Sequence, residues 1–250
     1  MPKAVFQSIY ADIKRNIESG AMQYQSLLLS ENEFAKQYSC SRSTIRRALS
    51  ELAQDGYVQP IHGKGVRVIW HPEKEPDATY SRIALESFSE QAGRMGFEAQ
   101  TVVMEFERLR AGARVAQTTG FSVGDELVYL FRRRMADGVP VTVDHTYVLD
   151  REIPGLTPEI AANSTYAYIE RELGLKIVTS KRSIVIEQAT QRDRDLLNLP
   201  DGLPAVAVVR SQSFDSNGIM FEYSESRQHP YFFSYLDTVV RPSASRMEAE

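Results

Sequence analysis

The 250-residue sequence contains a single cysteine, Cys40, and no long apolar segment. One cysteine cannot form a disulfide within the chain, which fits a protein kept in a reducing compartment. No stretch approaches the ~18 consecutive apolar residues of a membrane-spanning helix, and the first residues lack the apolar core of a secretory signal. We therefore expect a cytoplasmic protein without membrane contact.

The sequence also has little that would support catalysis. Its histidines are scattered, at His62, His71, His145 and His229, and none has the spacing of a metal site. There is no glycine-rich phosphate loop and no nucleophile elbow. Asp144 and Glu222 could be drawn as an acid pair, but carboxylates on strands are usually solvated or paired with arginine. We therefore expect no enzymatic activity, no cofactor and no metal ion.

Charge is unevenly distributed, although the net charge is only −4. Residues 1–69 carry nine Lys and Arg against six Asp and Glu, whereas the remainder carries 20 against 27. A mildly basic part joined to an acidic body is typical of a DNA reader attached to a second domain. A polar, proline-containing segment separates the two. We expect a first domain at 1–70, a linker at 71–80 and a second domain at 81–242.

The centre of the first domain is an amphipathic helix that begins after Ser41, which we expect to be its N-cap. Its apolar stripe has helical spacing and consists of Ile45, Ala48, Leu49 and Leu52. The opposite face and first turn carry Arg42, Ser43, Arg46, Arg47 and Ser50. A helix that buries one side and offers such residues on the other suits the DNA major groove. Alternatively, this is the solvated basic face of an ordinary surface helix.

The flanking residues favour the DNA-binding interpretation. Residues 30–38 predict a preceding helix, with Ser30 as its cap and Glu33 at the capping-box position, and a short turn then completes a helix-turn-helix. Strands at 57–59 and 66–69 enclose a glycine turn at 62–65 and predict a basic hairpin that contacts phosphate or the minor groove. Another amphipathic helix at residues 4–19 places Val5, Ile9, Ile13 and Ile17 at a spacing of four.

These elements resemble the winged-helix domain of the GntR family of bacterial repressors. The resemblance is carried by Ser30, Glu31, Ser41, Arg42, Ile45, Arg46, Ala48, Leu49, Leu52, Gly56, Tyr57, Gly63, Lys64 and Gly65. The chain departs from the family at Leu29, where proline is usual, and at Asn32, where arginine is common. Together, the resemblance and the basic surface predict DNA contacts by Arg42, Ser43, Thr44, Arg46, Arg47, His62, Gly63 and Lys64.

The second domain is predicted to be an α+β domain on an antiparallel sheet. Strands are expected at 98–109, 126–136, 139–149, 176–188, 204–214, 219–228 and about 233–239. Two of the connections, at 137–138 and 215–218, are strong hairpin signals. Helices are expected at 87–95, which Ser87 and Glu90 open as a capping box, at 164–173 and at 192–197. A polar connection is expected at 154–162.

An anion site is predicted on the strand at 126–136. Alternation along the strand puts Arg132 and Arg134 on one face. Two neighbouring guanidinium groups repel each other unless an anion lies between them, and phosphate accepts bidentate hydrogen bonds. The helix starts near Ser87 and Ser164 add backbone amides. The alternative is that these arginines pair with surface acids.

The second domain resembles the UTRA ligand-binding domain of the HutC subfamily, which shares the chorismate lyase fold. Matching motifs lie at 87–90, 132–138, 163–170 and 221–227. The resemblance implies a phosphate site formed by Phe88, Ser89, Arg132, Arg134, Ser164 and Tyr166. It also implies that Asp144 and Glu222 face the sugar hydroxyls. The family commonly has Glu at the position of Asp144. We assign Arg227 to the same effector site. Residues 168–175 and 223–227 are most similar to the trehalose operon repressors.

Taken together, the motifs predict a repressor that binds double-stranded operator DNA as a homodimer. A sugar phosphate, most of all trehalose 6-phosphate, is expected to release it. Two alternatives remain open at this point. The domain could sense another metabolite, such as an amino-sugar phosphate or a histidine-pathway acid, or the chain could be a lyase-like enzyme with a DNA-binding head.

Overall fold

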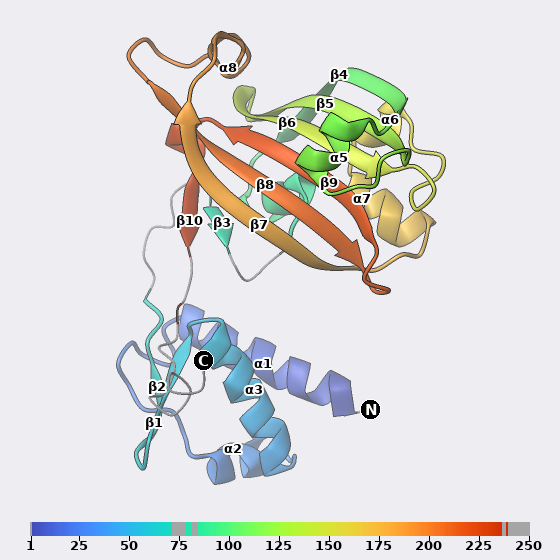
Figure 1. Ribbon diagram of the computed structural model, residues 1–250. Coiled ribbons are helices and arrows are strands. Elements are labelled where there is room, and N and C mark those ends of the chain that lie inside the picture. Colours follow the sequence, from blue (N-terminus) through green and yellow to red (C-terminus); the bar gives the residue numbers. More distant parts are fainter. Residues whose placement is uncertain (1, 72–78, 82–84, 237–238, 240–250) are drawn as a thin grey trace, which may run out of the picture. The chain divides into compact units, whose positions relative to one another are not determined.

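The computed structural model describes residues 2–71, 79–81, 85–236 and 239. The chain divides into two compact units, one containing the described residues up to 71 and the other containing residues 85–235. Figure 1 labels the elements of both. Most of the linker predicted at 71–80 lies outside the described residues.

The first unit consists of three helices and a two-stranded hairpin. They are α1 (Pro2–Glu18), α2 (Glu31–Gln37), α3 (Arg42–Gln54), β1 (Val58–Ile61) and β2 (Gly65–Val68). The two predicted caps are confirmed. Ser30 and Glu33 form a capping box at α2, and the Ser41 hydroxyl accepts a hydrogen bond from the Thr44 amide. The helix-turn-helix and its hairpin therefore form as the sequence predicts.

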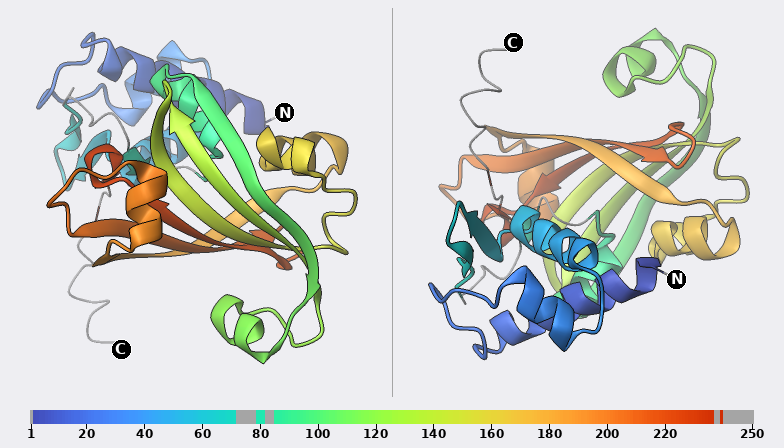
Figure 2. Two further views of the ribbon diagram at one scale, coloured as in Figure 1. Left: turned by 90° about the horizontal axis from the view of Figure 1, so that it is seen from above. Right: turned by 90° about the horizontal axis from the view of Figure 1, so that it is seen from below.

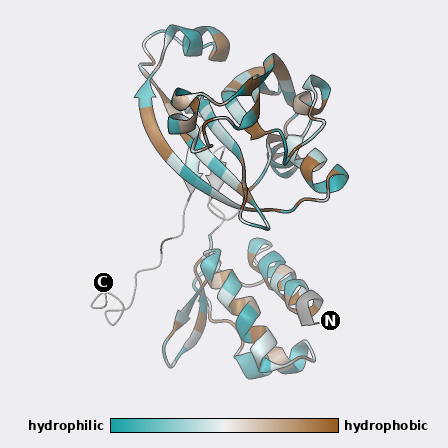
Figure 3. Ribbon diagram, turned by 45° about the vertical axis from the view of Figure 1, so that its right-hand side comes forward, coloured by the Kyte–Doolittle hydropathy of each residue, from teal (hydrophilic) through white to brown (hydrophobic). Residues whose placement is uncertain are grey.

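The apolar helix faces form the core of this unit, and each helix also carries hydrophilic residues (Figure 3). The predicted stripe on α3 is buried. On α1 the prediction is wrong at Val5, which is 44% exposed, whereas Phe6 is buried. An α-helix turns once every 3.6 residues, so a stripe with a spacing of four drifts around it. The buried face therefore begins at Phe6 and continues through Ile9 and Ile13.

The second unit is built on a six-stranded antiparallel sheet, which confirms the predicted α+β class. Its strands are β4 (Ala99–Arg110), β5 (Glu126–Ala136), β6 (Val139–Leu149), β7 (Ile177–Gln188), β8 (Ala205–Asp215) and β9 (Met220–Gln228). Their order across the sheet is β4-β5-β6-β9-β8-β7, and β3 (Thr79–Ser81) pairs separately with β10 (Ser234–Leu236). Because β6 pairs with β9, residues of the two predicted hairpins come together in the middle of the sheet.

Short helices connect these strands. They are α4 (Phe88–Met95), α5 (Ala113–Thr119), α6 (Pro158–Ala162), α7 (Thr165–Ala167), α8 (Gln191–Leu197), the π-helix η1 (Tyr168–Glu172) and the 3₁₀ turn η2 (Pro230–Phe232). The sequence did not predict α5, and α6 forms inside the segment expected to be a polar connection. The helix predicted at 164–173 forms as the short α7, which continues directly as η1.

Helices cover both faces of the sheet (Figure 2). Val128, Leu130 and Val148 pack with residues of α6 and η1, whereas Phe131 and Val143 pack with Leu197 of α8. Residues of β5 alternate between these two clusters, as strand geometry requires. The predicted site residues Arg132 and Arg134 share the face of Val128 and Leu130.

None of the helices within the described residues is long and apolar enough to cross a membrane. The same part of the chain holds no group of three or more His, Cys, Asp and Glu side chains arranged to bind a metal ion.

Candidate functional site

The first candidate site is the exposed face of α3. Arg42, Ser43, Arg46 and Arg47 are all exposed, and the Ser41 hydroxyl lies 2.8 Å from both the Ser43 and the Thr44 hydroxyl oxygens. These contacts fix the first turn of the helix and leave the long side chains in solvent. The surface therefore has the composition and the exposure of a major-groove reading helix.

Glu31 of α2 holds two of the predicted DNA-contacting arginines. Its carboxylate accepts hydrogen bonds from Arg46 Nε at 3.1 Å and Arg46 Nη2 at 2.9 Å, and from Arg42 Nη2 at 3.4 Å. The bonds from Arg46 outweigh desolvation and hold the pKa of Glu31 below its usual range. Glu31 was not predicted as a site residue. The sequence places Glu31 in the first turn of a helix that precedes an arginine-rich helix. The spacing along the chain does not show which of those arginines Glu31 contacts.

Arg47 has a second role besides its place on the basic surface. Its guanidinium lies 4.0 Å from the centre of the Phe6 ring, and its Nε is 3.5 Å from the Glu51 carboxylate. The cation–π contact with Phe6 ties α3 to α1, whereas the ion pair with Glu51 lies within α3. Arg47 therefore supports the packing of the unit as well as its positive face.

The β1–β2 hairpin presents its predicted residues at an exposed tip. His62, Gly63 and Lys64 are exposed, and the Lys64 amide donates to the Ile61 carbonyl at 3.1 Å. Gly63 has φ +70° and Gly65 has φ +107°. Positive φ is costly for residues with a Cβ, so the two glycines make the tight turn possible.

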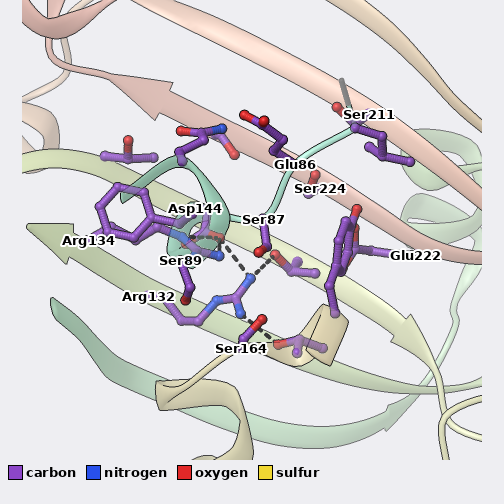
Figure 4. A pocket seen from close by; sticks show the side chains of 18 of the residues that line it. Glu86, Ser87, Ser89, Arg132, Arg134, Asp144, Ser164, Ser211, Glu222 and Ser224 are labelled. Atoms are coloured by element: carbon purple, nitrogen blue, oxygen red, sulfur yellow. Dashed lines mark hydrogen bonds and ion pairs between the residues drawn. The ribbon is translucent and has the colours of Figure 1, made fainter. Parts of the chain in front are cut away.

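The second candidate site is a pocket on one face of the six-stranded sheet (Figure 4). Its cavity is about 100 Å³ and opens to solvent. Eight of the nine predicted effector-binding residues line it, from α4, β5, β6, α7 and β9: Phe88, Ser89, Arg132, Arg134, Asp144, Ser164, Tyr166 and Glu222.

Arg132 and Arg134 share one partner, Asp144, whose Oδ2 accepts from Arg132 Nη2 at 2.8 Å and from Arg134 Nη2 at 2.9 Å. The expectation that their repulsion persists until an anion arrives is therefore wrong. The register places Asp144 directly opposite Arg132 on β6, so the carboxylate reaches both guanidinium groups. Burial alone raises the pKa of the Asp144 carboxyl, but the two arginines outweigh it and hold the pKa below its usual range.

The pocket also contains polar atoms that are buried without a partner among the described residues. They are Arg132 Nε, Asp144 Oδ1 and Ser180 Oγ. Buried polar groups normally find hydrogen-bond partners, because leaving one unpaired costs about 1–3 kcal/mol. Arg132 Nε is a donor, Asp144 Oδ1 is an acceptor, and Ser180 Oγ can act as either.

Glu222 has a different environment from Asp144. Its Oε1 accepts hydrogen bonds from the Tyr166 hydroxyl at 3.1 Å and the Ser213 hydroxyl at 3.4 Å. Burial raises the pKa of the Glu222 carboxyl above its usual range, although Arg132 opposes the change. The two pocket carboxyl groups therefore shift in opposite directions.

Two helix starts open onto the pocket. Ser87 and Glu90 form the predicted capping box of α4, and the Ser164 hydroxyl accepts from the Ala167 amide at 3.1 Å. The Arg134 guanidinium lies 5.4 Å from the centre of the Phe88 ring at the start of α4. This end of the pocket combines a guanidinium with the positive end of a helix dipole.

Arg227 does not belong to the pocket, and the prediction that it binds the effector is wrong. Its guanidinium donates to Asp193 at 2.8 and 3.0 Å and to Glu187 at 2.8 Å. Arg227 is five residues after Glu222 on β9, an odd spacing that puts the two on opposite faces of a strand. Its ion pairs join β9 to α8 and β7.

Several hydroxyl-bearing residues of the pocket were not predicted. They are Thr142, Thr146, Thr165, Ser180, Ser211, Ser224 and Ser226, and Arg182 lies with them. Alternation from Glu222 could have identified Ser224 and Ser226. Ser180 and Arg182 come from β7, whose pairing with β8 no hairpin signal in the sequence predicts.

Comparisons with known proteins match both units. Residues 6–68 match the model of the bacterial regulatory proteins of the gntR family, and residues 94–233 match the model of the UTRA domain. The chain is 38% identical to the HTH-type transcriptional regulator TreR of Bacillus subtilis, over 94% of this chain and 97% of that protein. It is 25% identical to the transcriptional repressor NagR of the same species, over 94% and 96%.

Solved structures show the same architecture. The possible transcriptional regulator YydK from B. subtilis superposes with a TM-score of 0.76 at 23% identity, covering 94% of this chain and 99% of that one. The effector-binding domain of the B. subtilis trehalose repressor superposes with a TM-score of 0.51 at 34% identity, covering 58% of this chain and 99% of that one.

Proposed function

Because the chain belongs to the GntR family of bacterial transcriptional regulators and carries a UTRA domain, we propose that it represses a sugar-utilisation operon and is released by trehalose 6-phosphate. The family assignment gives operator DNA and a small-molecule effector as its partners. The observation that carries the finer proposal is the pocket in which Arg132, Arg134 and Asp144 lie beside a helix start.

The charge of the pocket supports a phosphorylated ligand. Three arginines, Arg132, Arg134 and Arg182, line the pocket, and Asp144 pairs with the first two of them. Burial raises the pKa of the Glu222 carboxyl above its usual range. The start of α4 contributes backbone amides and a positive helix dipole. An anion such as a phosphate is therefore the ligand group that this lining favours.

The rest of the lining supports a sugar. Serines and threonines surround the pocket beyond the arginines, and hydroxyl groups can both donate and accept hydrogen bonds. A sugar presents hydroxyl groups of the same kind in many directions. The 38% identity to TreR and the likeness to the trehalose repressor domain make trehalose 6-phosphate the first sugar phosphate to test.

The first unit supplies the DNA-binding surface in this proposal. Arg42, Arg46 and neighbouring residues of α3 read base edges in the major groove, while His62 and Lys64 at the hairpin tip contact the adjacent backbone. Reading a near-palindromic operator requires two copies related by a two-fold axis. We therefore include a homodimer in the proposal.

Release requires that the sugar phosphate bind the DNA-free state more tightly than the DNA-bound state. A ligand with equal affinity for both states would leave operator occupancy unchanged. Other effectors, such as an amino-sugar phosphate or a histidine-pathway acid, would use the same linkage. Relatives named as transcriptional regulators favour this function over a lyase-like activity.

A thermal-shift panel tests the effector class. The panel contains trehalose 6-phosphate, glucose 6-phosphate, glucosamine 6-phosphate, urocanate, trehalose and inorganic phosphate. A ligand that binds only the folded state at about 100 times its Kd stabilises by ~2.7 kcal/mol. We expect trehalose 6-phosphate to raise Tm most and trehalose to have little effect. A larger shift with another compound would replace trehalose 6-phosphate as the effector.

A further inference from the structure

We propose that Glu222 binds the sugar as a neutral carboxylic acid that donates a hydrogen bond, whereas Asp144 stays ionised as the anchor of two arginines. The inference rests on the proposed sugar-phosphate function and concerns the protonation of the same pocket. It makes one carboxyl group a donor to the ligand and the other a fixed negative charge.

The contacts of the two carboxyl groups differ in kind. Asp144 accepts from two guanidinium groups at 2.8 and 2.9 Å. Glu222 has no ion pair within the described residues, and its partners there are the hydroxyls of Tyr166 and Ser213. Both side chains are almost fully buried, with 3% exposure for Asp144 and 5% for Glu222. Of these two similarly buried acids, only Asp144 therefore forms ion pairs within the described residues.

Burial without an ion pair favours the protonated form of a carboxyl group. Moving an ionised carboxylate out of water costs several kcal/mol unless opposite charges and hydrogen bonds compensate. The charged groups that act on Glu222 are Arg132 and Arg134 of β5 and Asp144 of β6. Asp144 already occupies both arginines, which reduces the charge they can offer to a second carboxylate. Arg182 of β7 also lines the pocket, and Tyr166 offers only a hydroxyl.

The geometry assigns the proton to the second oxygen of Glu222. Oε1 accepts from Tyr166 and Ser213, so the proton belongs on Oε2, for which no partner exists among the described residues. Glu222 lines the pocket, so Oε2–H can donate to a hydroxyl or ether oxygen of a sugar. A protonated Glu222 also avoids repelling the phosphate, whose charge is about −2 above its second pKa of ~6.

The proposal predicts opposite results for the amide substitutions Glu222→Gln and Asp144→Asn. Glu222→Gln replaces a neutral donor–acceptor group with another, so we expect affinity for trehalose 6-phosphate within roughly threefold of wild type near pH 6. Glu222→Leu lacks the donor and should weaken binding by about tenfold or more. Asp144→Asn removes the charge that pairs two arginines, so no similar rescue is expected, and its Tm should fall.

The pH dependence separates a neutral acid from an ionised one. Wild-type affinity should fall as pH rises through the pKa of Glu222, whereas Glu222→Gln should lack that component. Calorimetric titration of full-length wild type and Glu222→Gln with trehalose 6-phosphate, from about pH 6 to pH 9, measures the Kd of each protein at each pH. At each pH the Kd of wild type is divided by the Kd of Glu222→Gln. Ionisation of the ligand phosphate affects both values equally and therefore does not change this ratio. A ratio that does not change with pH, together with a loss in Glu222→Gln as large as in Glu222→Leu, would overturn the proposal.

Infrared spectroscopy gives a readout that needs no ligand. A protonated Glu222 contributes a carboxylic C=O absorption above the amide I band at neutral pH, and Glu222→Gln removes it. Absence of that absorption from the wild-type spectrum means that Glu222 is ionised, and the inference fails. If the absorption is present but no sugar phosphate binds wild type, the assignment of Glu222 stands and the proposed effector is wrong.

Discussion

Arg134→Ala is the substitution that tests the phosphate end of the pocket with least damage to the fold. The Arg134 side chain is 16% exposed, against 4% for Arg132, and it lines the pocket beside Phe88. After its removal Asp144 keeps the hydrogen bond from Arg132 at 2.8 Å. The buried carboxylate therefore remains paired, and the unit should fold.

The expected loss of effector affinity follows from the hydrogen bonds removed. A charge-assisted bond contributes roughly 1.5–3 kcal/mol, which corresponds to about a tenfold to 150-fold change in Kd. Operator affinity without effector should be unchanged, because none of the DNA-contact residues proposed on α3 and the hairpin is altered. The mutant should therefore bind operator normally and need about 10 to 150 times more trehalose 6-phosphate for release.

Fluorescence anisotropy of labelled operator, titrated with trehalose 6-phosphate, measures this release. Arg133→Ala is the matched control, since it removes the same charge from the neighbouring position on the opposite face of β5. We expect the control to release operator as wild type does. Release of Arg134→Ala at the wild-type concentration would refute the phosphate site, and equal defects in both variants would indicate a general effect of charge.

Four further substitutions test other parts of the account. Arg132→Ala leaves the buried Asp144 with one cation fewer, so we expect up to about 3–5 kcal/mol of destabilisation in urea unfolding; an unchanged midpoint would contradict the buried pair. Arg42→Ala should cost roughly 1–3 kcal/mol of operator binding with little change in Tm, and unaltered affinity would remove Arg42 from the reading surface. Lys64→Ala should weaken specific and random DNA alike and reduce the salt slope by about one, whereas a loss confined to operator would mean base contact. Glu31→Gln removes the carboxylate that holds Arg46 and Arg42 in place, so affinity for random DNA should rise more than affinity for operator; equal rises would show that Glu31 does not orient these arginines for base contact.

Local sequence signals predicted most of the secondary structure because their causes are local. The capping boxes at Ser30 and Ser87 and the hairpin turns at 137–138 and 215–218 formed where the sequence placed them. Helix α5 was missed, since it is only seven residues long, and its Gly112 N-cap makes no side-chain hydrogen bond. Such a helix depends on packing, with Val115 placed against an apolar cluster of the sheet.

The site was predicted in outline, and the errors have a common origin. Strand alternation correctly put Arg132 and Arg134 on one face, but their shared partner depends on the pairing of β5 with β6. The error at Arg227 came from taking a whole motif as one site, although alternate residues of a strand face opposite sides. Ser180 comes from β7, whose place beside β8 is known only from the sheet order.

The most direct test of the central claim uses the wild-type chain and a DNA fragment selected by binding from a random-sequence pool. Its affinity for that fragment is measured with and without trehalose 6-phosphate, with trehalose as the control sugar. The account predicts a near-palindromic fragment, tight binding without effector, and release by trehalose 6-phosphate but not by trehalose. Binding that is unaffected by trehalose 6-phosphate at concentrations that saturate the pocket would contradict it.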